Sequence, residues 1–270
     1  MTNLSKRAMQ LSDIQILNIY SKQADLNITM GGENWTQLSE KENPFMVATI
    51  VELIESVQHL NYKWWVHAED DMPQAQMEVI DMLHFVASFG IRKLGIGSAA
   101  QHMIEAQNLH QQAYADTWLK ATRVRPEFED GVVEGRWKTF LQLNQSALSV
   151  IQNGTKGLTY AAGDFNITYV SLCYDLLALS YELGLPKQEL YTRYIGKHAL
   201  NSFRQEMGSK TRGVVMSREE YRASDLPKPY LKIWTDAEDN EFLHYFLKFN
   251  SEATEEEIQQ FLRVEYEKHV

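Results

Sequence analysis

The chain has 270 residues, 44% of them hydrophobic and 23% charged, a balance typical of a globular protein with a sizeable core. Its formal net charge of −10 argues against a nucleic-acid partner, because such proteins carry a basic face that releases counterions. The first residues lack the apolar core of a signal peptide, and no stretch is apolar enough to span a membrane. The single cysteine, Cys173, excludes an intramolecular disulfide, and its apolar neighbours predict a buried thiol. We therefore expect a cytoplasmic protein, of a bacterial cell or a phage-infected host, without a nucleic-acid or membrane partner.

Apolar residues recur at steps of three and four along segments that only 6 prolines interrupt, which is the pattern of amphipathic helices. The sequence therefore predicts an all-α fold built as a multi-helix bundle. Thr254 and Glu257 form a capping-box pattern that begins the last helix. The predicted helices cover about 11–27, 44–60, 73–94, 97–121, 136–152, 164–182, 186–207, 236–248 and 254–268.

Two segments depart from this regular pattern. Residues 157–170 are rich in β-branched and aromatic residues, as a strand would be, but Asp164 and Asn166 are typical of a helix start and favour the helix. Residues 208–233 combine glycines, prolines and mixed charges without a period, which predicts a long irregular loop. No linker separates two parts of the chain, so residues 1–270 are expected to form one domain.

Acidic residues repeat at helical spacing in two of the predicted helices. Glu52 and Glu55 lie three residues apart in an apolar segment, and Glu78, Asp81 and His84 follow the same step in the next helix. Two such helices packed together would bring the carboxylates to one point, where cations must neutralise them. Hard oxygen ligands favour Mg²⁺, with Mn²⁺ as the alternative. The competing interpretation places each pair on a solvated helix face, as is usual for charged residues.

Short stretches of the sequence also carry a family likeness. They are KQADLN with the following NW, VELIESVQHLNYKWW, MEVIDMLHF and YIGKHALNSFRQEMGSKTRG, and KIWTDAEDNEFL adds a fifth. Together they resemble, in order, the dimeric dUTPases and dCTPase-dUTPases of the all-α NTP pyrophosphatase superfamily. The likeness covers about 14–92 and 164–247 and leaves a middle insertion at about 95–160. It implies the all-α NTP pyrophosphatase fold and hydrolysis of dUTP to dUMP and pyrophosphate by a metal-activated water.

The resemblance also implies which carboxylates hold the metal. Glu52, Glu78 and Asp81 match family ligands, whereas Thr49 stands where the family has the first glutamate of its first pair. Either Glu55, one helical turn onward, takes that role, or the site holds fewer metals, or catalysis is impaired. With Glu55 as the substitute, the catalytic pair is Glu52 and Glu55, and the metal ligands are Glu52, Glu55, Glu78 and Asp81.

The same resemblance implies a set of substrate-binding residues. Their chemistry suits the role, since amides can present donors and acceptors to a base and cationic side chains can bind phosphates. Near the base we expect Gln23, Asn27, Lys63 and Trp65, and His84, which follows the metal pair on the same helix face, is a further substrate-binding candidate. The predicted helix and loop after 186 supply Lys197, Asn201, Arg204, Gln205 and Lys210. The implied partners are a deoxynucleoside triphosphate substrate and a second copy of the chain, as a homodimer.

Three functions are compatible with these observations. The first is dUTP hydrolysis, with dUDP or dCTP as further substrates. The second is a pyrophosphatase for another nucleoside triphosphate, such as a modified one. The third is a nucleotide-binding or interaction module without catalysis, which the threonine at position 49 keeps open. Metal-dependent turnover with analysis of the phosphate products distinguishes the three.

Overall fold

The computed structural model describes residues 11–39, 41–60, 62, 65, 69–121, 138–149, 162–185, 187–211 and 236–268. All regular structure in these residues is helical, and none of them lies in a strand, so the all-α prediction is confirmed. The chain divides into two compact units, Met1–Tyr191 and Thr192–Val270. The expected single domain and its insertion stay predictions.

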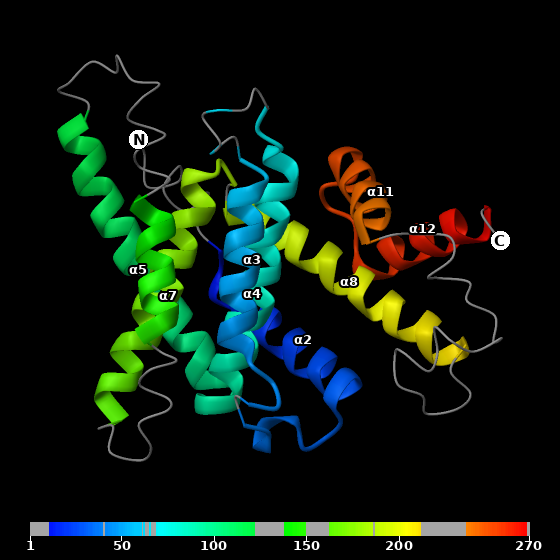
Figure 1. Cartoon of the computed structure of the whole chain (residues 1–270), viewed down its shortest axis with the longest axis horizontal. Coiled ribbons are helices and arrows are strands. Elements are labelled where there is room, and N and C mark those ends of the chain that lie inside the picture. The colour runs from blue at the N-terminus through cyan, green and yellow to red at the C-terminus, as the bar shows by residue number, and fades with distance from the viewer. Residues whose placement is uncertain are drawn as a thin grey trace. The chain divides into compact units, whose positions relative to one another are not determined.

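The first unit is a helical bundle around a long central helix (Figure 1). Helix α4 lies beside α3 and also contacts α2, α5 and α7, while α5 packs against α7. Residues 138–149 are helical as well, within the predicted helix 136–152. The bounds of the labelled elements are α2 Asp13–Gly31, η1 Trp35–Gln37, α3 Phe45–Gln58, α4 Met72–Leu94, α5 Ile96–Ala121 and α7 Ala162–Glu182.

Local sequence signals account for where these helices begin and end. Ser12 and Gln15 form a capping box at the start of α2, in which each side chain bonds the other residue's backbone N–H. Asp71 caps α4 by accepting a hydrogen bond from the backbone of Gln74, with a proline in the first turn. Helix α4 ends at Leu94, and the following C-cap residue is Gly95, whose φ of 79° favours glycine.

A close contact between α4 and α7 fixes the centre of the bundle. A Cβ atom at Gly90 would lie 2.0 Å from the hydroxyl oxygen of Tyr169, so only glycine allows the two helices to approach this closely. The Tyr169 hydroxyl donates to the Val86 carbonyl at 3.1 Å and lies 2.9 Å from the Tyr20 hydroxyl, which ties α2, α4 and α7 together. Cys173 is completely buried on α7, as predicted, and burial raises the pKa of its thiol to about 12.

The second unit contains most of α8 (Lys187–Thr211) together with α11 (Asp236–Phe249) and α12 (Glu255–Lys268). The predicted capping box begins α12, because Thr254 and Glu257 exchange hydrogen bonds between side chain and backbone. Helix α8 continues to Thr211, so the prediction of a loop is wrong for residues 208–211. The rest of the predicted loop, 212–233, lies outside the described residues.

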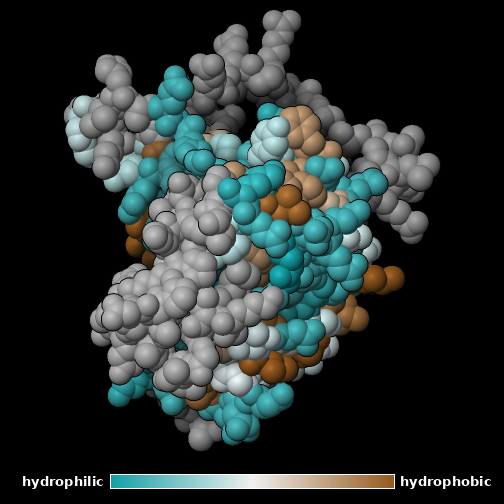
Figure 2. Space-filling model, turned by 90° about the vertical axis from the view of Figure 1, so that its right-hand side faces the viewer, coloured by the Kyte–Doolittle hydropathy of each residue, from teal (hydrophilic) through white to brown (hydrophobic). Residues whose placement is uncertain are grey.

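Hydrophilic side chains dominate the described part of the face drawn in Figure 2, and hydrophobic ones occur there in separate patches. No helix within the described ranges combines the length and the apolarity needed to cross a membrane.

Candidate functional site

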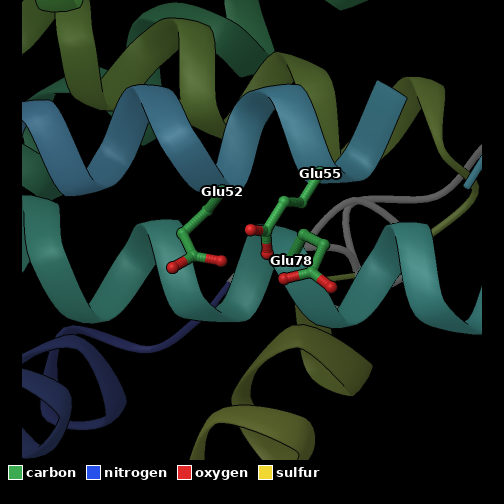
Figure 3. Close-up of side chains that lie close together, drawn as sticks. All are labelled: Glu52, Glu55 and Glu78. Atoms are coloured by element: carbon green, nitrogen blue, oxygen red, sulfur yellow. The ribbon is translucent and has the colours of Figure 1, made fainter. Parts of the chain in front are cut away.

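The acidic residues of α3 and α4 converge where the two helices lie side by side. Glu52 and Glu55 extend from α3 and approach Glu78 on α4 (Figure 3). One carboxylate oxygen from each of the three residues lies within 4.8 Å of the others. Asp81, one turn after Glu78, is close enough for its charge to act on Glu52. We name these four residues the acidic cluster.

The carboxylates of the acidic cluster repel one another, because like charges are crowded there. The pKa of Glu52 is raised to about 9 by burial, by the charge of Asp81, by a hydrogen bond with Glu78 and by the charges of Glu78 and Glu55, in that order. His59 offers one partner, with its Nε2 3.3 Å from Oε1 of Glu78. A divalent cation suits this donor set, because hard carboxylate oxygens neutralise it and their mutual repulsion is relieved when it binds.

Thr49, which resemblance places at a family glutamate, is completely buried on α3. Its hydroxyl donates a hydrogen bond to the Phe45 carbonyl one turn earlier, at 2.9 Å. This position therefore packs into the interior and satisfies its own polar group. Glu55 lies with the other carboxylates, which favours the hypothesis that it replaces the missing ligand, although its catalytic role stays a prediction.

A second polar group lies further along α4 and joins it to α2. Gln23 and Asn27 of α2 face His84 and Ser88 of α4, and all four side chains are buried. Nδ1 of His84 lies 2.5 Å from Oε1 of Gln23, and Nε2 of Gln23 donates to Oδ1 of Asn27 at 3.1 Å. Both amides donate to the Ser88 hydroxyl at 2.9 Å. We name these four residues the amide network.

The structure thus brings together three residues that the sequence suggested for substrate binding and adds Ser88. No sequence motif distinguishes Ser88, because a lone serine in an apolar helix is ordinary. Its contacts with α2 lie 61 and 65 residues away along the chain, so only the tertiary structure reveals them.

The tryptophan and lysine expected beside the base are less defined. Trp65 occupies a turn between α3 and α4, and its side chain is 63% exposed. Lys63 lies outside the described residues. Both assignments stay predictions.

The polar residues of α8 contact α11 within the second unit. Arg204 donates two hydrogen bonds to the buried carboxylate of Asp239, at 2.8 and 2.5 Å, and a longer one to Asn201 at 3.4 Å. Lys197 is buried and donates to the side-chain oxygen of Asn240 at 3.0 Å. Gln205 is half-buried, and Lys210 lies in α8 with its side chain outside the described part. The contribution of this helix to phosphate binding stays a prediction.

Comparison with known protein families identifies the fold and its chemistry. Residues 15–208, more than two thirds of the chain, match the dUTPase family. The matched range contains both the acidic cluster and the amide network. No curated protein matches the chain. Enzymes of the matched family are typically metal-dependent and act on a nucleotide. The chain belongs to the dimeric dUTPase family of all-α NTP pyrophosphatases, and it is a dUTP diphosphatase that hydrolyses dUTP to dUMP and pyrophosphate.

Proposed function

We propose that Glu52, Glu55, Glu78 and Asp81 bind the divalent metal on which dUTP hydrolysis depends, and that this metal is Mg²⁺. The observation that carries the proposal is the approach of three carboxylates from two helices to within 4.8 Å. Such an arrangement of like charges is unfavourable without a cation. An all-oxygen donor set without cysteine or paired histidines favours Mg²⁺, with Mn²⁺ as the alternative.

The position of the acidic cluster suits a triphosphate. A divalent cation held there would neutralise phosphate oxygens and activate the attacking water. Glu55 is exposed, so the cluster is open to a large anionic substrate, whereas Glu52 is half-buried and keeps the cluster anchored between the helices. We assign Glu52 and Glu55 as the catalytic pair because both extend from α3 toward Glu78 on α4 (Figure 3).

The amide network is proposed to bind the uracil base. Glu78, Asp81 and His84 follow each other at steps of three on α4, so the network begins about 4.5 Å further along the helix from Asp81. One face of one helix can therefore serve both ends of a nucleotide. Gln23, Asn27 and His84 are held in a buried and hydrogen-bonded arrangement, and such fixed groups discriminate well between bases. Lys63 and Trp65 are assigned to the same end of the substrate.

The α8 residues are proposed to complete substrate binding. Lys197, Asn201 and Arg204 follow steps of four and three, so they share one face of the helix. The bidentate contact of Arg204 with Asp239 uses the same fork geometry that binds a phosphate. Gln205, which is half-buried on α8, and Lys210, near the end of that helix, are assigned to substrate binding as well.

We further assign a homodimer as the working form. Support comes from α3, where Val47, Val51 and Ile54 are 50%, 44% and 52% exposed and lie at steps of four and three. Apolar side chains on one exposed helix face are typical of a protein interface. Sedimentation equilibrium of the wild type and of Val51→Lys tests this assignment, with dimers expected for the first and monomers for the second.

The metal assignment is tested by product analysis with purified protein and dUTP. We expect pyrophosphate as the first phosphate product, full activity with Mg²⁺ or Mn²⁺, and none in excess chelator. Ca²⁺ alone is expected to support little turnover, because its longer and more flexible coordination positions the substrate less well. Full activity in chelator would remove the acidic cluster from the reaction.

A further inference from the structure

Ser88 is the centre of the amide network and determines which way every polar atom in it points. Its side chain is 1% exposed, and its hydroxyl lies 2.7 Å from the carbonyl oxygen of His84, one turn earlier on α4. A carbonyl oxygen can only accept, so the single hydroxyl proton of Ser88 must point to it. Toward its other neighbours, the Ser88 oxygen can therefore act only as an acceptor.

This restriction fixes the orientation of both amides. Gln23 and Asn27 each place a terminal atom 2.9 Å from the Ser88 oxygen, and that atom must be the NH₂ nitrogen, since two oxygens would repel. Gln23 then uses its second N–H for Oδ1 of Asn27, at 3.1 Å. Its remaining atom, Oε1, faces the imidazole of His84.

The chain of hydrogen bonds ends on the histidine ring. Oε1 of Gln23 can only accept, so Nδ1 of His84 at 2.5 Å must carry a proton. A neutral imidazole has one ring proton, and its other nitrogen, Nε2, is then an acceptor. His84 is 4% exposed, and its Nε2 lies in the interior.

We propose that Ser88 is a positioning residue that holds His84 in the Nδ1–H tautomer, so that Nε2 accepts a hydrogen bond from the imide N3–H of uracil and rejects cytosine. Cytosine has an unprotonated N3, which would place two acceptors against each other. The proposal rests on the assignment of the amide network to the base. The proposal explains how the site selects dUTP over dCTP. It also assigns a role to Ser88, which contacts neither nucleotide.

A buried site that pairs with a substrate N–H discriminates strongly, because the wrong base leaves polar groups unpaired. Removing the Ser88 hydroxyl frees both amides to rotate and frees the ring to exchange tautomers. Ser88→Ala should therefore lower the ratio of kcat/KM for dUTP over dCTP by about tenfold, mainly through KM for dUTP. Ser88→Thr keeps a hydroxyl at the same position and should restore most of the ratio.

Ser180→Ala is the matched control for this experiment. Ser180 is also 1% exposed and bonds a carbonyl of its own helix, that of Leu177 at 2.8 Å, but it lies on α7 outside the amide network. The ratio of kcat/KM for dUTP over dCTP in Ser180→Ala should equal that of the wild type. Asn27→Ala and His84→Gln test the underlying assignment: if neither changes the ratio, the base is read elsewhere. If both lower it and Ser88→Ala does not, the positioning role of Ser88 is overturned while the site stands.

The tautomer can be measured directly in the wild-type protein. Long-range ¹H–¹⁵N spectra distinguish the two neutral forms of histidine, and comparison with His84→Gln assigns the signal among the 8 histidines. We expect His84 as the Nδ1–H form in the wild type and a mixture of forms in Ser88→Ala. An Nε2–H ring in the wild type would overturn the proposal.

Discussion

The acidic cluster and the amide network both include residues on neighbouring turns of α4. They differ in how many of their polar atoms form hydrogen bonds within the group itself. In the amide network five hydrogen bonds join Gln23, Asn27, His84 and Ser88, and His84 and Ser88 are 4% and 1% exposed. In the acidic cluster, three carboxylates face one another, and burial together with the neighbouring acidic groups raises the pKa of Glu52 to about 9. The amide network satisfies most of its polar atoms by internal hydrogen bonds and leaves an acceptor on the His84 ring, whereas the acidic cluster needs a cation.

This difference indicates a division of labour along one helix. A network held by internal hydrogen bonds can recognise a shape and a hydrogen-bond pattern without reorganising. A cluster of like charges has a high affinity for what neutralises it. Substitutions in the acidic cluster should therefore affect turnover and metal dependence, while those in the amide network should affect the choice of base.

The largest effect is expected from Glu78→Gln. It removes an anionic ligand and the partner of His59, and we expect kcat for dUTP to fall more than about a hundredfold, since even outer partners of metal ligands contribute 10–100-fold. Asp81→Asn should act in the same direction. Steady-state kinetics measure both, with the exposed Glu256→Gln as the control. Wild-type rates in both variants would place the metal elsewhere.

Glu55→Gln should have the next largest effect. If Glu55 replaces the ligand missing at Thr49, the variant should raise the Mg²⁺ concentration for half-maximal activity by about tenfold or more, as Glu52→Gln should. A titration of activity against Mg²⁺ gives this value. A mild effect of Glu55→Gln beside a severe one of Glu52→Gln would show that the site works with one carboxylate fewer.

Asn27→Ala should leave the metal dependence unchanged and alter recognition. Losing an amide that bonds both Gln23 and Ser88 should raise KM for dUTP several-fold and narrow its preference over other deoxynucleoside triphosphates. Kinetics with each of these substrates at saturating Mg²⁺ test the expectation. A changed Mg²⁺ dependence in Asn27→Ala would instead contradict the assignment of metal binding to the acidic cluster and base recognition to the amide network.

The smallest effect concerns stability without metal. Glu52→Gln removes one of the crowded carboxylates, so the metal-free protein should gain on the order of 1 kcal/mol, a figure that allows for the partial exposure of the site. Thermal unfolding in chelator measures the gain. Added Mg²⁺ should raise the Tm of the wild type more than that of the variant, and an equal rise would argue against binding at the cluster.

The sequence predicted most of the fold because helical periodicity and caps are local. The helix over 164–182 appears as α7, Ala162–Glu182, despite its β-branched residues, since the apolar positions of that segment pack inside the bundle. The 3₁₀ turn Trp35–Gln37 and the extension of α2 to Gly31 were not predicted, because they depend on contacts rather than on a period. The same holds for the last turn of α8.

The sequence also indicated the acidic cluster, because a spacing of three on two helices gives each helix one acidic face. It could not show that Glu52 and Glu78 would meet, which requires the register of α3 against α4. Ser88 was missed for the same reason. Its role depends on two amides from α2, and a single serine carries no sign of them in the sequence.

The central claim is that the metal binds between α3 and α4, and replacement of Mg²⁺ by Mn²⁺ makes the ion visible. Crystals of the full chain grown with Mn²⁺ and a non-hydrolysable dUTP analogue would locate it by anomalous scattering. We predict a peak at coordination distance from carboxylate oxygens of Glu52, Glu55, Glu78 or Asp81. An active, Mn²⁺-dependent enzyme whose only peaks lie away from these four carboxylates would contradict the claim.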